Sequence, residues 1–328
     1  MNERPLFSVI IINYNGGIFL QKALDSLVSQ SFKNFEVLVL DNASEDYSAD
    51  AADFDRLSQV KLIKEPTNHG FAKGNNLAAQ KAAGEWLVLL NPDCTATSTW
   101  LERIDAAIKA NPEISTFTCA QISLSDQSKL DGTGDAYNIF GIPWRGGFGH
   151  PAADLPDTGF CFSACGASAV YRKDLFLEVG GFDERFFCYC EDVDLGYRLQ
   201  LLGYDCLFLS DAIVHHEGSG ISGRHSYFTT YYGNRNRTWL YIKNTPLPLL
   251  IVTLPGHLAL LSYIYLRNCR GSRQNGLQKG LIDGLTQAWR LRNCPDYKTQ
   301  DRKISLLALT RKMSWNPFRM AARRPHVR

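Results

Sequence analysis

The stretch "WLVLLNPDC", residues 86–94, joins a run of apolar residues directly to a polar turn. The apolar run at 86–90 is typical of a strand in a parallel sheet that is covered on both faces. Asn91, Pro92 and Asp93 all favour turns, so Asp93 is expected at the carboxyl end of that strand. Its carboxylate is either an ordinary turn residue or a ligand for a metal ion or a phosphate group.

Three other apolar segments alternate with segments of helical spacing. Strands are predicted at residues 8–12, 35–40 and 60–63, and helices at residues 17–30 and 70–84. This alternation indicates an α/β fold with a Rossmann-like, mainly parallel central sheet flanked by helices and wound in right-handed crossovers. Ligands of such sheets bind beyond the carboxyl ends of the strands, so the residues at those ends are the first candidates for a functional site.

Small polar and acidic residues follow three of the predicted strands. They are Asn13, Tyr14 and Asn15 after the first strand, Asp41 and Asn42 after the second, and Asn91 and Asp93 after the fourth. Because the carboxyl ends of parallel strands meet at one edge of the sheet, we expect these groups to converge on one site. Each group alone is also explained by the preference of Asn and Asp for turns, and only their recurrence at three strand ends favours a site.

The later part of the chain is expected to complete this site. Residues 120–160, rich in Gly, Asp and Pro, predict loops and short strands that cover it, and residues 158–182 predict a pair of strands leading into a helix. Residues 191–204 predict another helix, which opens with Glu191 and Asp192. Acids at a helix start are stabilised by the helix dipole. The aromatic residues before this pair also favour a raised carboxylate pKa and service as a general base.

The phosphate-binding patterns of the common nucleotide folds do not occur in this sequence. The turn after the first strand is not GxGxxG, and the chain has no GxxxxGK[ST] segment. A nucleotide diphosphate would therefore need another counter-charge, and a divalent metal held by Asp93 is a natural substitute. Asp41 could accept a hydrogen bond from the imide N–H of uracil or thymine, or simply form a turn.

Further polar residues are candidates for phosphate or metal contacts. They are Asn68, Lys73 and Asn75 around the start of the helix predicted at 70–84, His215 with its neighbour His216 before Gly-Ser-Gly, and Arg235 and Arg237 among aromatic residues. Helix N-termini and lysine favour anions, imidazole binds metals, and arginine suits pyrophosphate. Each group also has an ordinary explanation, which is surface polarity, a buried core histidine or a solvated helix face.

The net charge of +2 hides an uneven distribution along the chain. Residues 267–328 hold 15 Lys+Arg and 3 Asp+Glu, a net charge of +12, which leaves −10 for the rest. A basic tail implies an anionic partner, either a membrane surface or a nucleic acid. Residues 249–266 are mostly apolar but interrupted by Pro, Gly and His, which favours an in-plane or re-entrant association with the membrane. A spanning helix and burial against the rest of the protein are the alternatives.

Chain length and cysteine usage limit the class of protein. A chain of 328 residues with 45% hydrophobic residues suits one large globular domain or two smaller ones. Nine cysteines without a paired CxxC spacing indicate reduced thiols in a cytosolic protein. The polar first residues predict no signal peptide.

Seven segments, all in register, resemble the family 2 glycosyltransferases and, within them, the bacterial rhamnosyltransferase-like branch. They are "VIIINYNGG" (9–17), "VLVLDNASED" (37–46), "NHGFAKGNN" (68–76), "LLNPD" (89–93), "VGGFDERFFCYCEDVDLGYRL" (179–199), "VHHEGSG" (214–220) and "GNRNR" (233–237). The resemblance implies a GT-A fold that uses a nucleotide-sugar donor and Mg²⁺ or Mn²⁺. We expect a catalytic domain at 1–240, followed by a basic, partly apolar, helical and membrane-associating extension at 241–328.

The resemblance also implies roles for individual residues. Asp192 would be the base that deprotonates the acceptor hydroxyl, supported by Glu191. Asp93 fills the last position of the DxD-type metal motif, and His215 would be the histidine on the metal or phosphate side. Asp41 would hold the nucleotide base. Asn91 departs from the stricter motif, which has Asp there, and leaves fewer charges for the metal.

These roles amount to an inverting transfer of rhamnose or another hexose, from dTDP-rhamnose or a UDP-sugar, to a lipid-linked saccharide. Such an enzyme would act in cell-surface polysaccharide synthesis, in the cytoplasm and peripheral at the inner face of the plasma membrane. One alternative is a catalytically silent nucleotide-sugar-binding protein, which Asn91 favours. The other is a nucleic-acid-binding protein that uses the basic tail, but no recognition motif supports it, and no nucleic-acid partner is expected.

Overall fold

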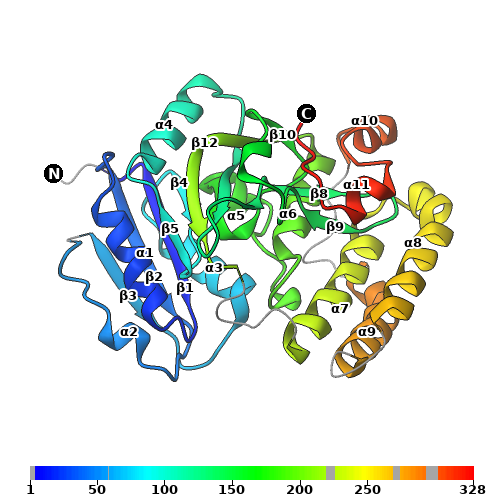
Figure 1. Cartoon of the computed structure of the whole chain (residues 1–328), viewed down its shortest axis with the longest axis horizontal. Coiled ribbons are helices and arrows are strands. Elements are labelled where there is room, and N and C mark those ends of the chain that lie inside the picture. Colours follow the sequence, from blue (N-terminus) through cyan, green and yellow to red (C-terminus); the bar gives the residue numbers. More distant parts are fainter. Residues whose placement is uncertain (1–3, 58, 219–225, 269–273, 293–301) are drawn as a thin grey trace.

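The computed structural model describes residues 4–57, 59–218, 226–268, 274–292 and 302–328, and Figure 1 shows their arrangement. The strands are β1 (Phe7–Asn13), β2 (Phe35–Asp41), β3 (Val60–Lys64), β4 (Trp86–Leu89), β5 (Cys94–Ala96), β6 (Thr116–Ser123), β7 (Leu130–Gly132), β8 (Asp135–Tyr137), β9 (Pro143–Arg145), β10 (Gly159–Cys161), β11 (Ala169–Arg172) and β12 (Cys206–His216). The helices are α1 (Ile18–Val28), α2 (Ser48–Ala51), α3 (Gly70–Lys81), α4 (Trp100–Ala110), α5 (Lys173–Glu178), α6 (Glu191–Leu202), α7 (Tyr227–Asn244), α8 (Leu247–Asn268), α9 (Gln274–Arg292), α10 (Leu306–Arg311) and α11 (Pro317–Ala321).

One twisted sheet organises the molecule, in the strand order β10-β12-β6-β11-β4-β1-β2-β3, with β5 beside β12 and β7 beside β6. Strands β4, β1, β2 and β3 are parallel to one another, as the alternation of strands and helices predicted. Strand β12 is parallel to β6, whereas β11 lies antiparallel between β4 and β6. Strands β8 and β9 form a separate antiparallel pair.

Both faces of β1, β2 and β4 are buried, which explains their continuous apolar runs, whereas the edge strand β3 is partly exposed. Alternate residues of β1 point to opposite faces. Val9 and Ile11 pack in one hydrophobic cluster with residues of α1 and α4, whereas Ile10 and Ile12 pack in another with residues of α3, α5 and α6. The result is a three-layer α/β domain with its cores on the two sides of the sheet.

The prediction of a strand pair within residues 158–182 was wrong in its pairing. Two strands and a helix are present there, but β10 pairs with β12 and β11 pairs with β4 and β6. The apolar pattern marks these residues as strands but carries no information on partners that are distant in sequence. The separation matters, because residues 162–168, which connect β10 to β11, include Cys165, Gly166 and Ala167 of the cavity described in the next subsection.

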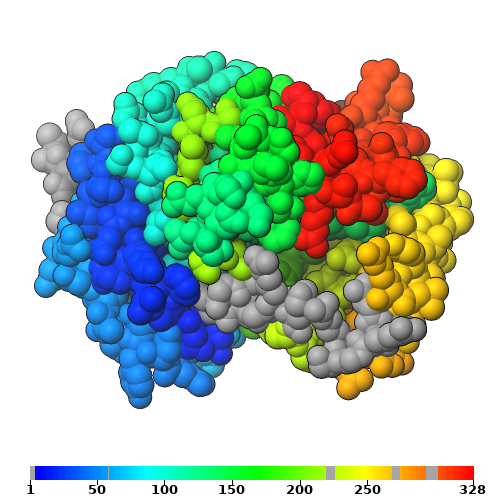
Figure 2. All heavy atoms as spheres, viewed as in Figure 1, coloured from blue at the N-terminus to red at the C-terminus, as the bar shows by residue number. Residues whose placement is uncertain are grey.

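The C-terminal helices pack tightly against the α/β domain. Helix α7 continues through the predicted boundary between residues 240 and 241, and α9 lies along it. The close approach requires Gly280, because a Cβ there would lie 2.5 Å from the carbonyl oxygen of Tyr231. The Lys243 ammonium of α7 is buried between Asp183 and Asp194, at 2.8 Å and 2.7 Å. In Figure 2 the C-terminal residues cover part of the same body rather than extending away from it.

Helix α8 has one buried and one exposed face. His257 is fully buried and lies 2.8 Å from the carbonyl oxygen of Phe140 through its Nδ1, and its ring stacks on Tyr241. By length and composition alone, Leu247–Arg267 is the one described helix that could cross a membrane, with a mean hydropathy of 1.8 and 22% of the apolar window buried.

Candidate active site

The polar residues after β1 and β2 converge at the carboxyl edge of the sheet. Asn13 and Asp41 are register partners, and the Asn13 amide donates a hydrogen bond to the Asp41 carboxylate at 2.9 Å. The Asn42 amide donates to Asn68 at 2.9 Å, and its oxygen accepts from the backbone N–H of His69 at 2.8 Å. These bonds join two strand ends to the start of α3, so the three elements form one rigid wall.

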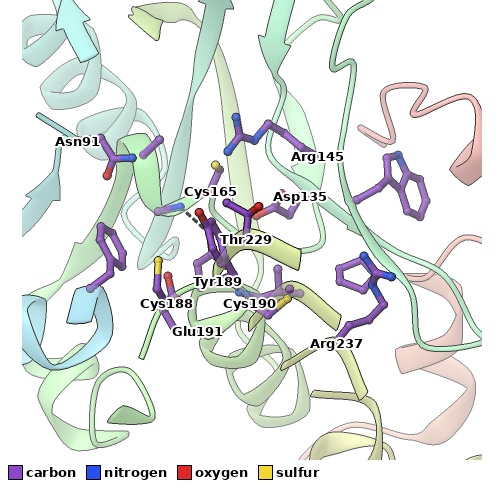
Figure 3. Close-up of a pocket in the computed structure, with 18 residues that line it drawn as sticks. Asn91, Asp135, Arg145, Cys165, Cys188, Tyr189, Cys190, Glu191, Thr229 and Arg237 are labelled. Atoms are coloured by element: carbon purple, nitrogen blue, oxygen red, sulfur yellow. Dashed lines mark hydrogen bonds between the residues drawn. The ribbon is translucent and has the colours of Figure 1, made fainter. Parts of the chain in front are cut away.

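Two adjoining cavities open at this edge of the sheet. The first, about 210 Å³, is called the Asp93 cavity, and its lining includes Tyr14, Asn42, Asn68, Asp93 and His216. The second, about 330 Å³, is called the Asp192 cavity, and its lining includes Asp135, Cys165, Glu191, Asp192 and Arg237 (Figure 3). Five residues line both cavities, namely Phe71, Asn91, Arg145, Cys188 and Tyr189. Asp93 on one side and Glu191 and Asp192 on the other therefore line cavities that share part of their walls.

Asp93 and His216 lie in contact with each other on the wall of the Asp93 cavity. His216 Nε2 lies 3.3 Å from Asp93 Oδ1, and His216 Nδ1 lies 2.6 Å from Asp131 Oδ2. Burial lowers the pKa of His216, but hydrogen bonding to Asp131 and Asp93 outweighs burial, so the pKa is raised. With Nδ1–H donated to Asp131, Nε2 faces a carboxylate, and this arrangement calls for a proton or a metal cation between them.

The residues around this pair fit Mg²⁺ or Mn²⁺, since carboxylates are the preferred ligands of both and imidazole suits Mn²⁺. The thiol of Cys94 belongs to the same cluster. Burial and the neighbouring Asp93 carboxylate raise the pKa of Cys94 well above its usual value, so this thiol stays protonated. Asp93 and His216 are therefore the side chains of this cluster that could hold an ion.

Arg145 supplies positive charge at the junction of the two cavities. Its guanidinium lies 2.6 Å from Asp131 Oδ2 and 3.5 Å from His216 Nδ1. Burial alone would raise the pKa of Asp131, but Arg145 and His216 outweigh it and lower that pKa to about 2. Asp131 is therefore ionised, and it holds the imidazole and the guanidinium in place together.

Glu191 and Asp192 begin α6 at the wall of the Asp192 cavity. The two carboxylate oxygens of Asp192 accept backbone hydrogen bonds from Gly166 and Val193, each at 2.8 Å. Burial raises the pKa of Asp192 despite these bonds, and burial and the Asp192 charge raise the pKa of Glu191 well above its usual value. The raised carboxylate pKa expected from the aromatic surroundings is therefore present.

The chain before α6 is strained and held from behind. Phe187, Tyr189 and Cys190 all have positive φ, at 66°, 73° and 66°, a conformation that non-glycine residues rarely adopt. The Asn236 amide of α7 donates to the carbonyl oxygens of Phe186, Cys188 and Tyr189 at 2.7–2.9 Å. The last helix of the predicted catalytic domain thus fixes the segment that both cavities share.

Several predicted site residues line neither cavity. They are Asn13, Asn15, Asp41, Lys73, Asn75, His215 and Arg235. Arg235 instead donates to the carbonyl oxygen of Phe186 at 3.1 Å and stacks on Trp239, so it supports the strained segment. His215 lies next to His216 on β12, and because strand side chains alternate between faces, only His216 reaches Asp93. Residues 219–225, which include most of the Gly-Ser-Gly loop, lie outside the described residues.

Sequence reasoning did not single out Asp131, Asp135 or Arg145, and it named His216 only as the neighbour of His215, to which it gave the metal role. Asp131, Asp135 and Arg145 all lie in "LDGTGDAYNIFGIPWR", residues 130–145, which the sequence marked only as loops and short strands over the site. The alternation of β12 was a signal that could have separated His216 from His215, had the register of that strand been known.

Two family models and several relatives match the sequence of this chain. The sequence model of Glycosyl transferase family 2 matches residues 8–180, and that of Glycosyl transferase family group 2 matches residues 156–320. The chain is 28% identical to an N-acetylglucosaminyl-diphospho-decaprenol L-rhamnosyltransferase of Mycobacterium tuberculosis, over 84% of this chain and 97% of that protein.

Solved structures resemble the fold. One is S. aureus TarS in complex with UDP-GlcNAc, with 20% identity, a TM-score of 0.58 and coverage of 86% of this chain and 81% of that chain. Another is the mannosyltransferase PcManGT from Pyrobaculum calidifontis in complex with GDP-Man and Mn²⁺, with 18% identity, a TM-score of 0.54 and 88% coverage of both chains. The fold is that of the GT-A glycosyltransferases, and the chain belongs to glycosyltransferase family 2, in its rhamnosyltransferase-like branch.

Proposed function

We propose that this protein is an inverting glycosyltransferase that moves rhamnose or another hexose from a nucleotide-diphosphate donor to a hydroxyl of a lipid-linked saccharide. The observation that carries this proposal is the pair of cavities that meet at Asn91 and Arg145, one with Asp93 and His216 and the other with Asp192. The name of the M. tuberculosis relative supports rhamnose as the transferred sugar and lipid-linked N-acetylglucosamine as the acceptor, and dTDP-rhamnose is our first choice of donor. A UDP-sugar is the second choice of donor, because the structurally similar TarS was solved in complex with UDP-GlcNAc.

The donor would lie in the Asp93 cavity, with its nucleoside against Tyr14, Asn42 and Asn68. Asp93 and His216 would hold Mg²⁺ or Mn²⁺, which supplies positive charge to neutralise the diphosphate as it leaves. His216 takes the role expected of His215, because it is the histidine that faces Asp93. Arg145 lines both cavities and would add a fixed positive charge near the breaking bond.

Asp192 would act on the acceptor from the other cavity. Its carboxylate accepts the proton of the acceptor hydroxyl, while that oxygen forms a bond to the anomeric carbon of the donor. Attack from the face opposite the diphosphate breaks the bond between the anomeric carbon and the phosphate oxygen, which inverts the configuration. The backbone bonds from Gly166 and Val193 orient Asp192 for this transfer.

The test begins with a thermal-shift screen of nucleotide sugars, with and without Mn²⁺, because a bound ligand stabilises the folded state. Transfer is then measured with the donor that gives the largest shift. The Asp192→Asn variant is expected to lose about 10²- to 10⁴-fold in kcat while keeping the donor-induced shift. Full activity in this variant would refute Asp192 as the base, and a screen without any shift would count against donor binding.

We also propose that the exposed face of α8 docks on the cytoplasmic surface of the plasma membrane. Ile251, Val252, Tyr263 and Leu266 are each more than half exposed, and the tail at 267–328 carries a net charge of +12. Apolar side chains beside basic residues suit an anionic lipid surface. Sedimentation with vesicles containing anionic lipid tests this proposal. The Val252→Glu variant should bind less, and a matched Ala106→Glu change on α4 should not alter binding.

A further inference from the structure

A second carboxylate faces Asp192 across the Asp192 cavity. Carboxylate oxygens of Asp135 and Asp192 and the sulfur of Cys165 lie within 4.8 Å of one another, and Figure 3 shows Asp135 and Cys165 on the cavity wall. Asp135 is only 7% exposed, and within the described part of the chain its carboxylate has no hydrogen bond or ion pair. A buried, unpartnered carboxylate that lines a cavity points to a ligand, because burial of such a group without a partner is costly.

The backbone holds Asp135 firmly in this position. Its N–H donates to the carbonyl oxygen of Ser163 at 2.9 Å, and its own carbonyl oxygen accepts from Phe162 at 3.1 Å. Asp135 lies directly opposite Arg145 in the β8–β9 pair, yet the Arg145 guanidinium is turned to Asp131 at 2.6 Å. Asp135 therefore faces the cavity without an ion pair, and Arg145 only partly offsets, from a distance, the burial that raises the pKa of Asp135.

Two carboxylates this close in a buried cavity do not both ionise readily, so one of them retains a proton. Asp192 accepts two backbone N–H groups, which favours its ionised form, whereas Asp135 accepts none through its side chain. The proton therefore belongs on Asp135. In agreement, burial and then the Asp192 charge raise the pKa of Asp135 well above its usual value.

We propose that Asp135 is a neutral carboxylic acid of the acceptor site, which donates a hydrogen bond to an acceptor oxygen beside the hydroxyl that Asp192 activates. This inference rests on the proposed function, because it needs a saccharide in the Asp192 cavity. The acceptor class it defines is a sugar ring that presents two neighbouring oxygens, one to each carboxylate. A neutral Asp135 also leaves Asp192 ionised and able to act as the base.

The other titratable groups around Asp135 limit how its ionisation is measured. They are Glu191, Asp192 and Cys190 around the start of α6, Arg145 of β9, Cys165, Tyr171 of β11 and Cys206 of β12. Burial raises the pKa of Tyr171 and of the three thiols, so all four stay neutral, and Arg145 stays charged. Besides Asp192 itself, only Asp135 and Glu191 in this set are left to titrate at alkaline pH.

The experiment compares pH profiles of kcat/KM for the acceptor. The probes are dTDP-rhamnose with Mn²⁺ and a short-chain N-acetylglucosaminyl-diphospho-lipid. The wild type should lose activity on the acid side as Asp192 gains a proton and on the alkaline side as Asp135 loses one. The Asp135→Asn variant, which mimics the neutral acid, should keep the acid limb and lose the alkaline limb. The Glu191→Gln variant should keep both limbs, whatever its rate.

A second variant measures the hydrogen bond itself. Asp135→Ala should raise the acceptor KM by about tenfold or more and leave the donor KM unchanged, because one hydrogen bond to the acceptor is lost. An alkaline limb that persists in Asp135→Asn or disappears in Glu191→Gln would overturn the role of Asp135. Weaker Mn²⁺ binding by Asp135→Asn would also overturn it, by assigning the carboxylate to an ion. A wild type that transfers nothing would instead overturn the proposed function, and the role of Asp135 with it.

Discussion

Replacing Asp131 with Asn should weaken Mn²⁺ binding. Asp131 would act indirectly, because its carboxylate is paired with His216 and Arg145 and does not itself face the ion site. Asp131 Oδ2 lies 2.6 Å from His216 Nδ1 and 2.6 Å from Arg145, and its side chain is 3% exposed. An amide in this position keeps the shape but loses the charge that makes the imidazole a strong ligand at Nε2. Removing such a partner of a ligating histidine costs about 10- to 100-fold in metal affinity, or about 1.4–2.8 kcal/mol.

The assay is titration of the purified protein with Mn²⁺, with free Mn²⁺ followed by electron paramagnetic resonance in the presence of a nucleoside diphosphate. The matched control is Asp126→Asn, because Asp126 lies five residues earlier and pairs with Lys129 in an ion pair whose side chains are 42% and 54% exposed. The control should bind Mn²⁺ like the wild type. A folded Asp131→Asn variant with the wild-type Mn²⁺ affinity would show that Asp131 does not act through His216.

Three further predictions concern stability. Lys243→Met should lower the free energy of unfolding in urea by about 3–5 kcal/mol, because it removes the buried ammonium that pairs with Asp183 and Asp194. A loss below about 1 kcal/mol would contradict this. Hydrogen-bonded cations outweigh burial and lower the pKa of Asp183 to about 2. The ionised Asp183 therefore contributes its full stabilisation above about pH 4 and loses it as the pH falls toward 2. The free energy of unfolding measured at a series of acidic pH values should show this loss, and in Asp183→Asn it should depend less on pH. Gly70→Ala should destabilise the fold by about 1–3 kcal/mol, seen as a lower thermal unfolding temperature, and should weaken nucleotide binding. The reason is that Gly70 has φ +77° and a Cβ there would lie 2.5 Å from the Phe187 carbonyl oxygen.

The parallel half of the fold could be predicted because its signals are local. Each predicted strand, at 8–12, 35–40, 60–63 and 86–90, is present within one or two residues at each end. Covered parallel strands are continuous in apolar residues, and the turn residues after them mark the edge where ligands bind. The convergence of Asn13 with Asp41, and of Asn42 with Asn68, followed from this topology alone.

The rest of the site depends on contacts that no local pattern encodes. His216 rather than His215 faces Asp93 because of the register of β12 against β5 and β6, which is set by pairing over long separations. Asp131 and Asp135 lie in a segment without periodicity, and their roles arise only when β7 pairs with β6 and β8 pairs with β9. Arg235 was predicted to bind phosphate because it is an arginine among aromatic residues. Its guanidinium instead donates hydrogen bonds to the carbonyl oxygens of residues 185 and 186.

The balance of charge at the junction gives a physical reason for Asn91. This residue lines both cavities, between the carboxylates of Asp93 and Asp192, and Arg145 is the cation that lines both of them among the described residues. A carboxylate at position 91 would add a further negative charge to a buried space whose lining already includes the carboxyl groups of Asp135, Glu191 and Asp192. It would also raise the pKa of Asp192 further and repel the diphosphate. A neutral amide there avoids both effects, while Asp93 and His216 remain to hold the ion, so the departure from the stricter motif is compatible with transfer and is not evidence for a silent site.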